Sequence, residues 1–376
     1  MTISEQFESP LRVLAVCAFP VEAAATRFRL AQFIEPLKDR GIELTISPFL
    51  TIKQFTELYQ GGKTLSKVTG MAFSVIKRLA ETISVRRYDV ILVQREAMIF
   101  GPGIFEWLYS NIGRKRLVLD LDDATYVRYV SPTYGRMGSA LKFFGKTDNL
   151  IRRSAKVICG NRFIAEYVSA NGGSPVVVPT VVDTEIFKPR SDSRDNGPLT
   201  VGWIGTHSTF PFLAKLFPVL ERLSDHFDFE LKIVGAGDVD LKSEKINFKA
   251  TAWSLDREPD DFNSLDIGLY PIFPEGAAND EWIKGKSGFK AVQYMAVGVP
   301  FVMSPVGVCA EIGDPGLTHL NAATNEDWYT SLDMLLSNPQ LRSDMGLAGR
   351  QYSVRHFCIN QHAGALADVL KSVAPR

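Results

Sequence analysis

Short runs of aliphatic and β-branched residues alternate along the chain with longer stretches of helical spacing, and this alternation limits the possible folds more than any other feature. Strands separated by helices pair in parallel through right-handed crossovers, and near-continuous apolar strands are typical of a sheet that helices cover on both faces. The pattern therefore predicts a doubly wound α/β domain. In the first half of the chain, strands are predicted at residues 11–19, 42–49, 88–94, 116–122, 156–161 and 175–180.

The alternation stops once, at the polar segment KPRSDSRDNGP of residues 188–198, which has no periodicity and is typical of a linker. A chain of 376 residues suits two domains of roughly 100–200 residues each. We therefore expect two Rossmann-like domains, residues 1–188 and 199–355, that face each other across a cleft at the carboxyl ends of their strands. In the second half, strands are predicted at residues 199–205, 229–237, 246–253, 266–272 and 300–305.

Composition excludes several classes of protein. The chain has 42 basic and 42 acidic residues, so its net charge of zero does not favour nucleic acid as a partner. Its four cysteines form no CxxC pair, which argues against a metal site and favours the reduced thiols of a cytoplasmic protein. The first residues lack the basic start and apolar run of a signal peptide, and no apolar run approaches the roughly 20 residues that span a bilayer. We expect a cytoplasmic protein.

Positive charge is concentrated in residues 63–87, which hold six lysines and arginines and Glu81 as their single acidic residue. Apolar residues recur in this segment at roughly helical spacing. A basic amphipathic helix of this kind can bind anionic lipid, which would place the protein peripherally at the inner face of the membrane. The alternative is an ordinary helix with a solvated charged face, and the sequence leaves both interpretations open.

The loop after the first predicted strand leads into a helix whose first turns carry Arg27 and Arg29. The helix dipole is positive there, so two cations are unfavourable unless an anion neutralises them. One interpretation is that both arginines contact a bound anion such as phosphate; the other is two exposed arginines in a first helical turn. No GxGxxG motif accompanies them, so a dinucleotide fingerprint is absent.

Charged residues also follow two further strands of this half. Arg95 and Glu96 follow one of them, and Asp120, Asp122 and Asp123 lie at the end of the other. The three carboxylates could bind a divalent cation, hold sugar hydroxyls or cap the following helix, and one of them could be the buried partner of Arg95. We predict that Asp122 or Asp123 faces the cleft, and that no metal is bound.

In the second half, the segment GWIGTHST of residues 202–209 joins a strand to a helix with small and hydroxyl residues. Backbone N–H groups at such a turn are suited to phosphate. We therefore predict that Gly205, Thr206, His207 and Ser208 contact a phosphorylated ligand. A histidine in this place is more often structural than catalytic.

The most informative segment is KGKSGFKAVQYMAVGVP, residues 284–300, in which a glycine-rich basic loop leads into a helix that Gly298 and Pro300 end. Ser287 is predicted to be the N-cap of this helix. In its second turn, Gln293 shares a face with the helix start, three residues after a lysine.

Three lysines, Lys284, Lys286 and Lys290, bracket this helix start, and Gly285 and Gly288 open it to close approach. A helix N-terminus with this charge is a suitable site for pyrophosphate. A reaction that transfers a group from a nucleotide to an acceptor requires stabilisation of the charge on the leaving phosphate. Lys286 and Lys290 are the residues predicted to provide this stabilisation, and they are the predicted catalytic lysines. A solvated basic loop is the alternative.

Together these segments resemble the family 4 type of retaining glycosyltransferases, which have the GT-B architecture. The likeness covers nearly the whole chain and rests on the order and spacing of its motifs. It implies transfer of a sugar from a nucleotide-sugar donor to a glycan or lipid-linked acceptor, in cell-surface polysaccharide or glycoconjugate synthesis. The motifs are ATRFRL, VQREAMIFGP, DLDDATY, VICGNRFIAEYV, VPTVVDTEIF, GWIGTHST, IVGAGD, DIGLYPI and GFKAVQYMAVGVPFVMSPVG.

The resemblance also assigns parts of the site. Residues 1–188 would hold the acceptor, residues 199–355 the nucleotide sugar, and the helix of residues 356–376 would cross back to the first domain. Such enzymes have two glutamates on the helix after the glycine loop: Gln293 stands at the ribose-binding position, and Gly285 replaces the other glutamate.

Other expected groups are replaced as well. An arginine and a lysine that clamp the pyrophosphate are expected around Thr206 and are missing, so Lys286 and Lys290 are predicted to take their place. A histidine near the sugar is replaced by Asp122 or Asp123. The implied reaction retains the anomeric configuration without a metal or any other cofactor.

The complete set of predicted site residues falls into three groups. The catalytic group is Asp122, Asp123, Lys286 and Lys290, and the donor-binding group is Gly205, Thr206, His207, Ser208, Lys284, Ser287, Gly288 and Gln293. The residues predicted to contact the acceptor or a phosphate are Arg27, Arg29, Arg95 and Glu96.

Two other functions remain possible on the sequence. A sugar-nucleotide epimerase shares the two-domain shape and would use carboxylates such as Asp122, Asp123 and Glu311 as acid and base. A catalytically decayed scaffold that binds nucleotide without turnover would explain the missing glutamate and arginine, although the three lysines argue against it.

Overall fold

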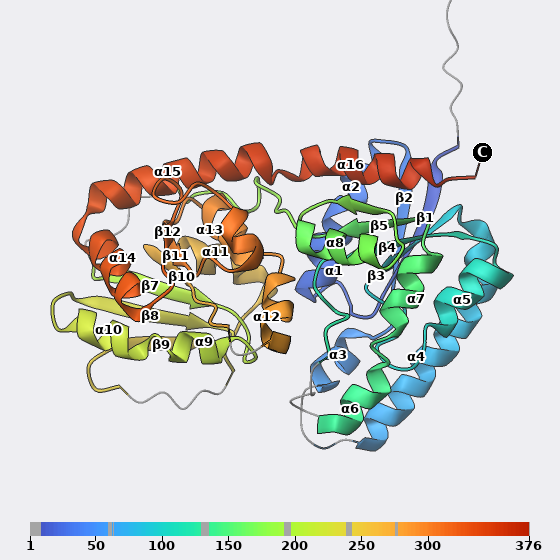
Figure 1. Cartoon of the computed structure of the whole chain (residues 1–376), viewed down its shortest axis with the longest axis horizontal. Coiled ribbons are helices and arrows are strands. Elements are labelled where there is room, and N and C mark those ends of the chain that lie inside the picture. The colour runs from blue at the N-terminus through green and yellow to red at the C-terminus, as the bar shows by residue number, and fades with distance from the viewer. Residues whose placement is uncertain are drawn as a thin grey trace, which may run out of the picture. The chain divides into compact units, whose positions relative to one another are not determined.

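The structure is a computed structural model, and it describes residues 9–58, 62, 64–128, 135–191, 197–237, 243–274 and 277–375. The chain forms two compact units, one of Met1–Thr180 with Ile359–Arg376 and the other of Val181–Cys358 (Figure 1). Each unit is a parallel sheet with flanking helices, which confirms the predicted α/β fold of two Rossmann-like domains. Lys63, Asp238 and residues 192–196 of the predicted linker lie outside the described residues.

The first unit is built on a parallel sheet whose described strands are ordered β2-β1-β3-β4-β5-β6. Its central strands are buried on both faces, and all five residues of β3 are buried. This burial explains why the strands read as unbroken apolar runs in the sequence. The strands are β1 (Leu11–Cys17), β2 (Ile42–Pro48), β3 (Val90–Gln94), β4 (Arg116–Leu121), β5 (Lys156–Cys159) and β6 (Pro175–Val177).

Helices cover this sheet, and the longest of those described in the unit is α4. The C-terminal helix α16 packs against α2, so the end of the chain belongs to the first unit. The helices are α1 (Ala24–Arg29), α2 (Ile34–Lys38), α3 (Ile52–Leu58), α4 (Thr64–Ser84), α5 (Ile104–Trp107), α6 (Gly135–Lys142), α7 (Lys146–Arg153), α8 (Arg162–Ala170) and α16 (Ile359–Ser372).

The second unit has a parallel sheet of described strands ordered β12-β11-β10-β7-β8-β9. A hydrophobic core that includes Trp203, Leu231 and Trp328 fills the space between this sheet and its helices. The strands are β7 (Leu199–Ile204), β8 (Phe229–Val234), β9 (Asn247–Thr251), β10 (Ile267–Tyr270), β11 (Phe301–Met303) and β12 (Leu320–Asn321). The helices are α9 (Phe210–Ala214), α10 (Phe217–Ser224), α11 (Glu258–Asn263), α12 (Ala277–Lys284), α13 (Phe289–Ala296), α14 (Asn325–Ser337) and α15 (Pro339–His356).

Every strand predicted from the sequence is present, and the structure adds β12, whose two residues are too few to form a recognisable pattern. The sequence also predicts a single helix from Thr26 to about Asp39 after the first strand, and this prediction is wrong. The segment is three short elements, because Leu30 leaves the helical conformation with φ −127° after α1. Pro36 lies in the first turn of α2, where its missing N–H costs no hydrogen bond.

The boundary between the units differs slightly from the predicted one. Residues 181–188 were expected in the first domain, but residues from Val181 onward belong to the second unit. Arg350 of α15 holds this segment, because its guanidinium donates to the carbonyls of Thr184 at 2.9 Å and Phe187 at 2.7 Å. These hydrogen bonds join residues more than 160 positions apart, so the local sequence pattern could not predict the boundary.

Among the described residues, no helix combines the length and the apolar composition that crossing a bilayer requires.

The core of the second unit contains a histidine that is kept neutral. His319 is fully buried, stacks on the Phe301 ring at 5.3 Å, and lies 2.9 Å from the Thr318 hydroxyl and 3.1 Å from the Asn321 amide oxygen. Burial lowers the pKa of His319 from 6.5 to about 4, because the charged imidazolium loses its hydration.

This burial predicts a stability change in mild acid. As pH falls from 6.5 to about 4, the unfolded chain gains a proton at His319 that the folded chain excludes. The free energy of unfolding should therefore decrease by about 3 kcal/mol over this window relative to that of a His319→Gln variant. Urea denaturation of both proteins across the window measures the difference. Parallel pH profiles for the two proteins would contradict the assignment.

Candidate functional site

Ligands of open parallel sheets bind beyond the carboxyl ends of the strands, so the candidate residues of each unit are sought there. In the first unit, α1 follows β1, Arg95 and Glu96 follow β3, and Asp122 and Asp123 follow β4. The structure shows that most of these charged groups bind each other.

Arg29 is buried and forms a two-pronged ion pair with Asp120. Its Nε donates to Asp120 Oδ2 at 3.0 Å, and its Nη2 donates to Asp120 Oδ1. A further hydrogen bond of 2.8 Å runs from Nη1 to the Val178 carbonyl. A phosphate contact for Arg29 stays a prediction, and the geometry offers it no support, because a ligand would have to replace a buried carboxylate.

Arg95 makes a second buried ion pair at the same edge. Its Nε and Nη2 donate to the two oxygens of Asp122, both at 2.6 Å, and Nη2 also lies 3.4 Å from Asp123 Oδ2. Arg95 has a φ of 61°, an uncommon conformation that turns its side chain out of the strand direction. Burial alone would raise the pKa of Asp122, but the charge and hydrogen bonds of Arg95 outweigh burial and lower that pKa. Asp122 is therefore ionised.

The two remaining charged candidates of the first unit also have partners. Glu96 forms an ion pair of 2.7 Å with Lys146, a buried residue that the sequence analysis did not single out. Arg27 donates to the Glu22 carbonyl at 3.0 Å and lies over the Phe28 ring. The candidates Arg27, Arg95, Glu96 and Asp123 are half-buried, whereas Arg29, Asp120 and Asp122 are buried and therefore less accessible to a ligand.

No group of three metal-ligating side chains is placed to hold an ion in the part of the chain that the structure describes. Both carboxylate oxygens of Asp122 accept hydrogen bonds from Arg95, and both carboxylate oxygens of Asp120 accept hydrogen bonds from Arg29. A cation would compete with two guanidinium groups for these oxygens, so the carboxylate pattern that suggests a metal in the sequence is explained by ion pairing.

In the second unit, the loops after β7 and β8 meet at the carboxyl edge of the sheet. Gly205 follows β7 and donates to the Val234 carbonyl at 3.0 Å, and Gly235 follows β8 and donates to the Thr251 carbonyl at 3.0 Å. A Cβ on Gly235 would lie 2.3 Å from the Gly205 oxygen, and its φ of 82° also requires glycine. The loops can pack this closely only because Gly235 lacks a side chain, while a Cβ on Gly205 would lie 2.2 Å from the Trp203 ring.

The predicted donor residues of this turn are accessible. Thr206, His207 and Ser208 are exposed, and the hydroxyls of Thr206 and Ser208 are 2.8 Å apart. The turn therefore offers hydroxyl groups beside the β7 strand end, while the contact of these residues with a ligand stays a prediction.

The start of α13 differs from the prediction in one respect. Ser287 is not the N-cap, because α13 begins at Phe289 and its N-cap is Gly288, with no side-chain hydrogen bond to the helix. Gly288 has a φ of 64°, and a Cβ there would lie 2.3 Å from Ile312 Cδ1. The chain can enter the helix only through this tight left-handed turn, which the sequence indicates by the glycine and not by the serine.

The lysines do gather around this helix start. Lys284 is exposed, and its Cα packs against Gly307 of the loop after β11, where a Cβ would lie 2.6 Å away. Lys286 is half-buried, with its Nζ over the ring of Trp282 at 3.5 Å from the centroid. Trp282 was not predicted from the sequence. It sets the direction of the Lys286 ammonium by a cation–π contact.

Lys290 belongs to a polar chain that runs into the core. Its Nζ donates to Gln293 Oε1 at 3.0 Å, and Gln293 Nε2 donates to Glu258 Oε1 at 3.2 Å. Gln293 is fully buried and Glu258 is nearly so. In this structure Gln293 therefore positions Lys290, and the ribose contact that the resemblance implies for Gln293 stays a prediction.

Glu258 is the functional candidate that sequence reasoning missed. It opens α11, thirty-five residues before Gln293, and an acidic residue in a first helical turn is explained equally well by the helix dipole. No local pattern connects the two residues, so only the folded chain reveals the contact.

Part of the chain matches a known protein family. Residues 198–338 match the family model described as "Glycosyl transferases group 1". The match covers most of the second unit. The loops after β7 and β8, the start of α13 and the buried Gln293 all lie within the matched region. The match confirms the expected resemblance and the assignment of the chain as a transferase enzyme.

The architecture matches that of solved GT-B glycosyltransferases. Sucrose-phosphate synthase from Thermosynechococcus elongatus matches with a TM-score of 0.67 and 12% identity over 97% of this chain and 99% of that one. A glycosyltransferase from Rickettsia africae ESF-5 matches with a TM-score of 0.68 and 14% identity, covering 97% and 99%. Anabaena HepE matches with a TM-score of 0.66 and 14% identity, covering 96% and 100%. At these identities the likeness shows the shared fold. No curated protein matches the sequence significantly.

The buried pair of Arg29 and Asp120 supplies a prediction about stability. Arg29→Met should lower the free energy of unfolding by about 3–5 kcal/mol, because Asp120 is left buried without its counter-ion. The double variant Arg29→Met/Asp120→Leu should lose less, because it removes both charges together. Chemical denaturation of the three proteins measures the losses. Equal destabilisation of the single and double variants would mean that packing, and not charge, is what Arg29 contributes.

Proposed function

We propose that this chain transfers a sugar from a nucleotide-sugar donor to a glycan or lipid-linked acceptor, with retention of the anomeric configuration and in cell-surface polysaccharide or glycoconjugate synthesis. The observation that carries the proposal is the start of α13, where Lys284, Lys286 and Lys290 surround a helix N-terminus inside the region that matches the group 1 glycosyltransferase family model. Lysines and the positive end of a helix together favour a diphosphate.

In this proposal the lysines stabilise the charge that develops on the nucleoside diphosphate as the bond to the sugar breaks. Trp282 keeps Lys286 near the helix start, and Gln293, itself held by Glu258, orients the ammonium of Lys290. Positive charge that is already oriented needs little reorganisation during the reaction, which is the condition for effective electrostatic catalysis. The exposed hydroxyls of Thr206 and Ser208 supply further donors for the donor phosphates or sugar.

Uridine nucleotides are the donors to test first. HepE has been solved with UDP, with UDP and glucose, and with UDP-glucose. We propose the same class of ligand for this chain on the basis of the shared fold and the diphosphate-binding character of the α13 start. The acceptor in this proposal meets the first unit, where the predicted contacts Arg27, Arg95 and Glu96 are half-buried and Arg29 is buried.

The lysine assignment predicts a loss of nucleotide affinity. Lys286→Ala and Lys290→Ala should each weaken UDP binding by about 1–3 kcal/mol, because each removes a charge-assisted hydrogen bond to phosphate. Isothermal titration calorimetry measures the change. Lys249→Ala, at an exposed lysine of β9, is the matched control and should bind UDP like the wild type. Unchanged affinity in both test variants would remove the diphosphate site from the start of α13.

Turnover distinguishes the proposed function from its rivals. Incubation with UDP-glucose and candidate acceptors should yield UDP and a glycosylated product with the α configuration of the donor, as read by mass spectrometry and NMR. An isomerised UDP-sugar without transfer would establish an epimerase, and tight UDP binding without any product would establish a catalytically decayed scaffold.

We also propose that transfer needs no metal, because the ion pairs of Asp120 and Asp122 occupy the carboxylates that would bind one. The initial rate of product formation should be the same with EDTA as with added Mg²⁺. A rate that EDTA abolishes and Mg²⁺ restores would instead assign the aspartates a metal.

A further inference from the structure

Helix α4 of the first unit differs from an ordinary surface helix: Met71 and Val75 pack against the core, but most of its large apolar side chains are exposed. Such helices normally turn their apolar stripe to the core. In α4, the residues directed into the unit include buried Ser74 and Arg78, whereas large apolar side chains are exposed on the other side.

Polar contacts hold the inner side of α4. Buried Arg78 donates to Glu81 Oε1 at 2.8 Å, to the Cys17 carbonyl at 3.1 Å and to the Ser47 carbonyl at 3.0 Å. The Tyr109 hydroxyl donates to the same Glu81 oxygen at 2.9 Å. These bonds attach the helix at its polar side and leave its apolar side facing outward. The orientation is therefore built into the fold.

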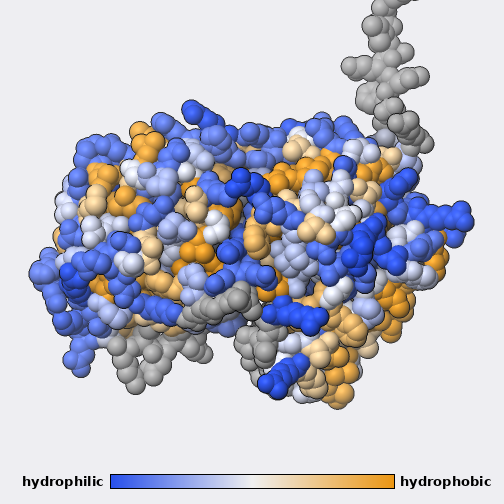
Figure 2. All heavy atoms as spheres, viewed as in Figure 1, coloured by the Kyte–Doolittle hydropathy of each residue, from blue (hydrophilic) through white to orange (hydrophobic). Residues whose placement is uncertain are grey.

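The outer side forms a continuous apolar face. Ile76 is 63% exposed and Ile83 is 80% exposed, although isoleucine is among the residues most often buried. Figure 2 shows hydrophobic residues gathered where Figure 1 places α4. Helix α5 contacts α4 and exposes Ile104 and Trp107 as well. The apolar face of α4 consists of Leu65, Val68, Phe73, Ile76, Leu79 and Ile83.

Positive charge accompanies this face. Lys77, Arg86 and Arg87 are exposed on α4 and on the turn that follows it. Glu81 is the only acidic residue of residues 63–87, and its carboxylate is bonded to Arg78 on the inner side. The apolar face thus has a basic and not an acidic border.

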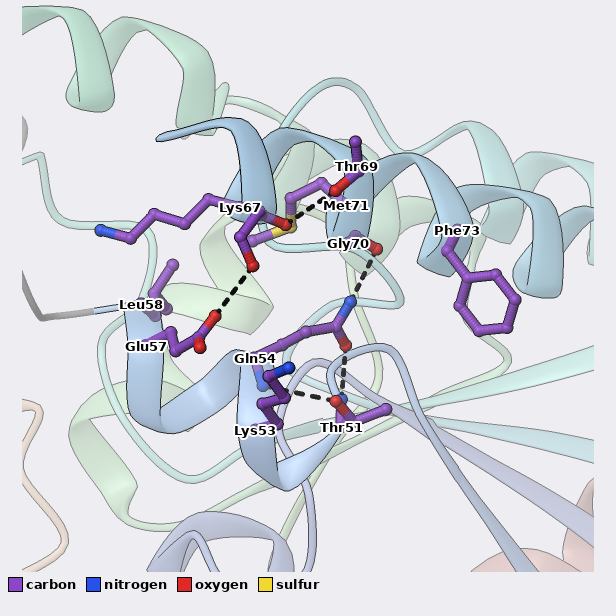
Figure 3. A pocket seen from close by; sticks show the side chains of 11 residues that line it. Thr51, Lys53, Gln54, Glu57, Leu58, Lys67, Thr69, Gly70, Met71 and Phe73 are labelled. Carbon is purple, nitrogen blue, oxygen red and sulfur yellow. Dashed lines mark hydrogen bonds between the residues drawn. The ribbon is translucent and has the colours of Figure 1, made fainter. Parts of the chain in front are cut away.

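The hollow between α3 and α4 has charged residues of both signs in its lining. Its volume is about 320 Å³, and it is lined by Lys53 and Lys67 and by the acidic Glu57. Figure 3 shows Gln54 of α3 joining the helices, and its amide donates to the Gly70 carbonyl of α4 at 2.6 Å. Phe73 of α4 also lines the hollow, so the hollow adjoins the exposed apolar side of the helix.

We propose that α4 docks the first unit on the surface of an anionic lipid bilayer. The apolar face enters the boundary between headgroups and acyl chains, and the basic border contacts anionic headgroups. A second copy of this chain fits the same face less well, because pairing α4 with itself would bring two basic borders together. Docking depends on neither donor nor acceptor, so its test is independent of the proposed function.

Vesicle binding by the full chain tests this proposal. Cosedimentation is measured with vesicles of phosphatidylcholine alone and of equimolar phosphatidylcholine and phosphatidylglycerol. Wild-type protein should bind the anionic vesicles, bind the neutral ones much more weakly, and dissociate from the anionic ones at high salt. Absence of binding to the anionic vesicles, or equal binding to both compositions, would overturn the proposal.

Variants identify the surface involved. Ile76→Glu/Ile83→Glu should reduce the partition coefficient at least about tenfold, because two exposed apolar side chains are lost from the interface. Arg86→Glu and Arg87→Glu should each reduce it about fivefold or more, which is the effect of one basic residue near an anionic surface. Leu347→Glu, at an equally exposed leucine of α15 in the second unit, should bind like the wild type and is the matched control.

Light scattering of the same proteins tests the alternative occupant. The wild type and the Ile76→Glu/Ile83→Glu variant should have the same mass in solution. A wild-type dimer that this variant converts to a monomer, together with no vesicle binding, would show that the face joins two copies of the chain and would overturn the proposal.

Discussion

Parallel strand pairing is the constraint on which the rest of this structure depends. In each unit it brings the carboxyl ends of all strands to one edge of the sheet, so residues far apart in sequence meet there. In the first unit it brings Arg29, Asp120 and Asp122 together, and in the second it brings the turn after β7 beside that after β8. Glycine at 235 lets these two turns touch, because a Cβ there would lie 2.3 Å from the Gly205 oxygen. The chemistry of the chain is therefore concentrated at two sheet edges.

The two edges treat their charges differently. In the first unit, Arg29 and Arg95 are each neutralised by an aspartate, and buried pairs of this kind cost much free energy to break. In the second unit, Lys286 contacts the Trp282 ring and Lys290 contacts the Gln293 amide, and both contacts orient a cation. Oriented positive charge favours the binding of a diphosphate. This contrast is why the donor site is proposed in the second unit.

Polar bonds also fix the orientation of helix α4 at the surface of the first unit. Its polar side is anchored by Arg78 and Glu81, so turning the apolar side inward would break the hydrogen bonds of Arg78 to the Cys17 and Ser47 carbonyls and that of Tyr109 to Glu81. The exposed apolar face is thus stabilised by the bonds behind it. An apolar face of this kind lowers the solubility of a protein unless a membrane or a partner molecule covers it.

The sequence by itself determined the strands, the two-domain division and the importance of the lysine-rich segment, because period, glycine and charge are local properties of the chain. It did not determine which aspartate pairs with Arg29 or Arg95, since these partners lie on different strands and several carboxylates fit equally well. It could not show that Glu258 holds Gln293, because thirty-five residues separate them without a shared pattern. It left open whether the basic helix turns its apolar stripe inward or outward. Only the tertiary structure decided that, because the direction depends on Ser47, Cys17 and Tyr109, which lie outside the helix and receive or donate its hydrogen bonds.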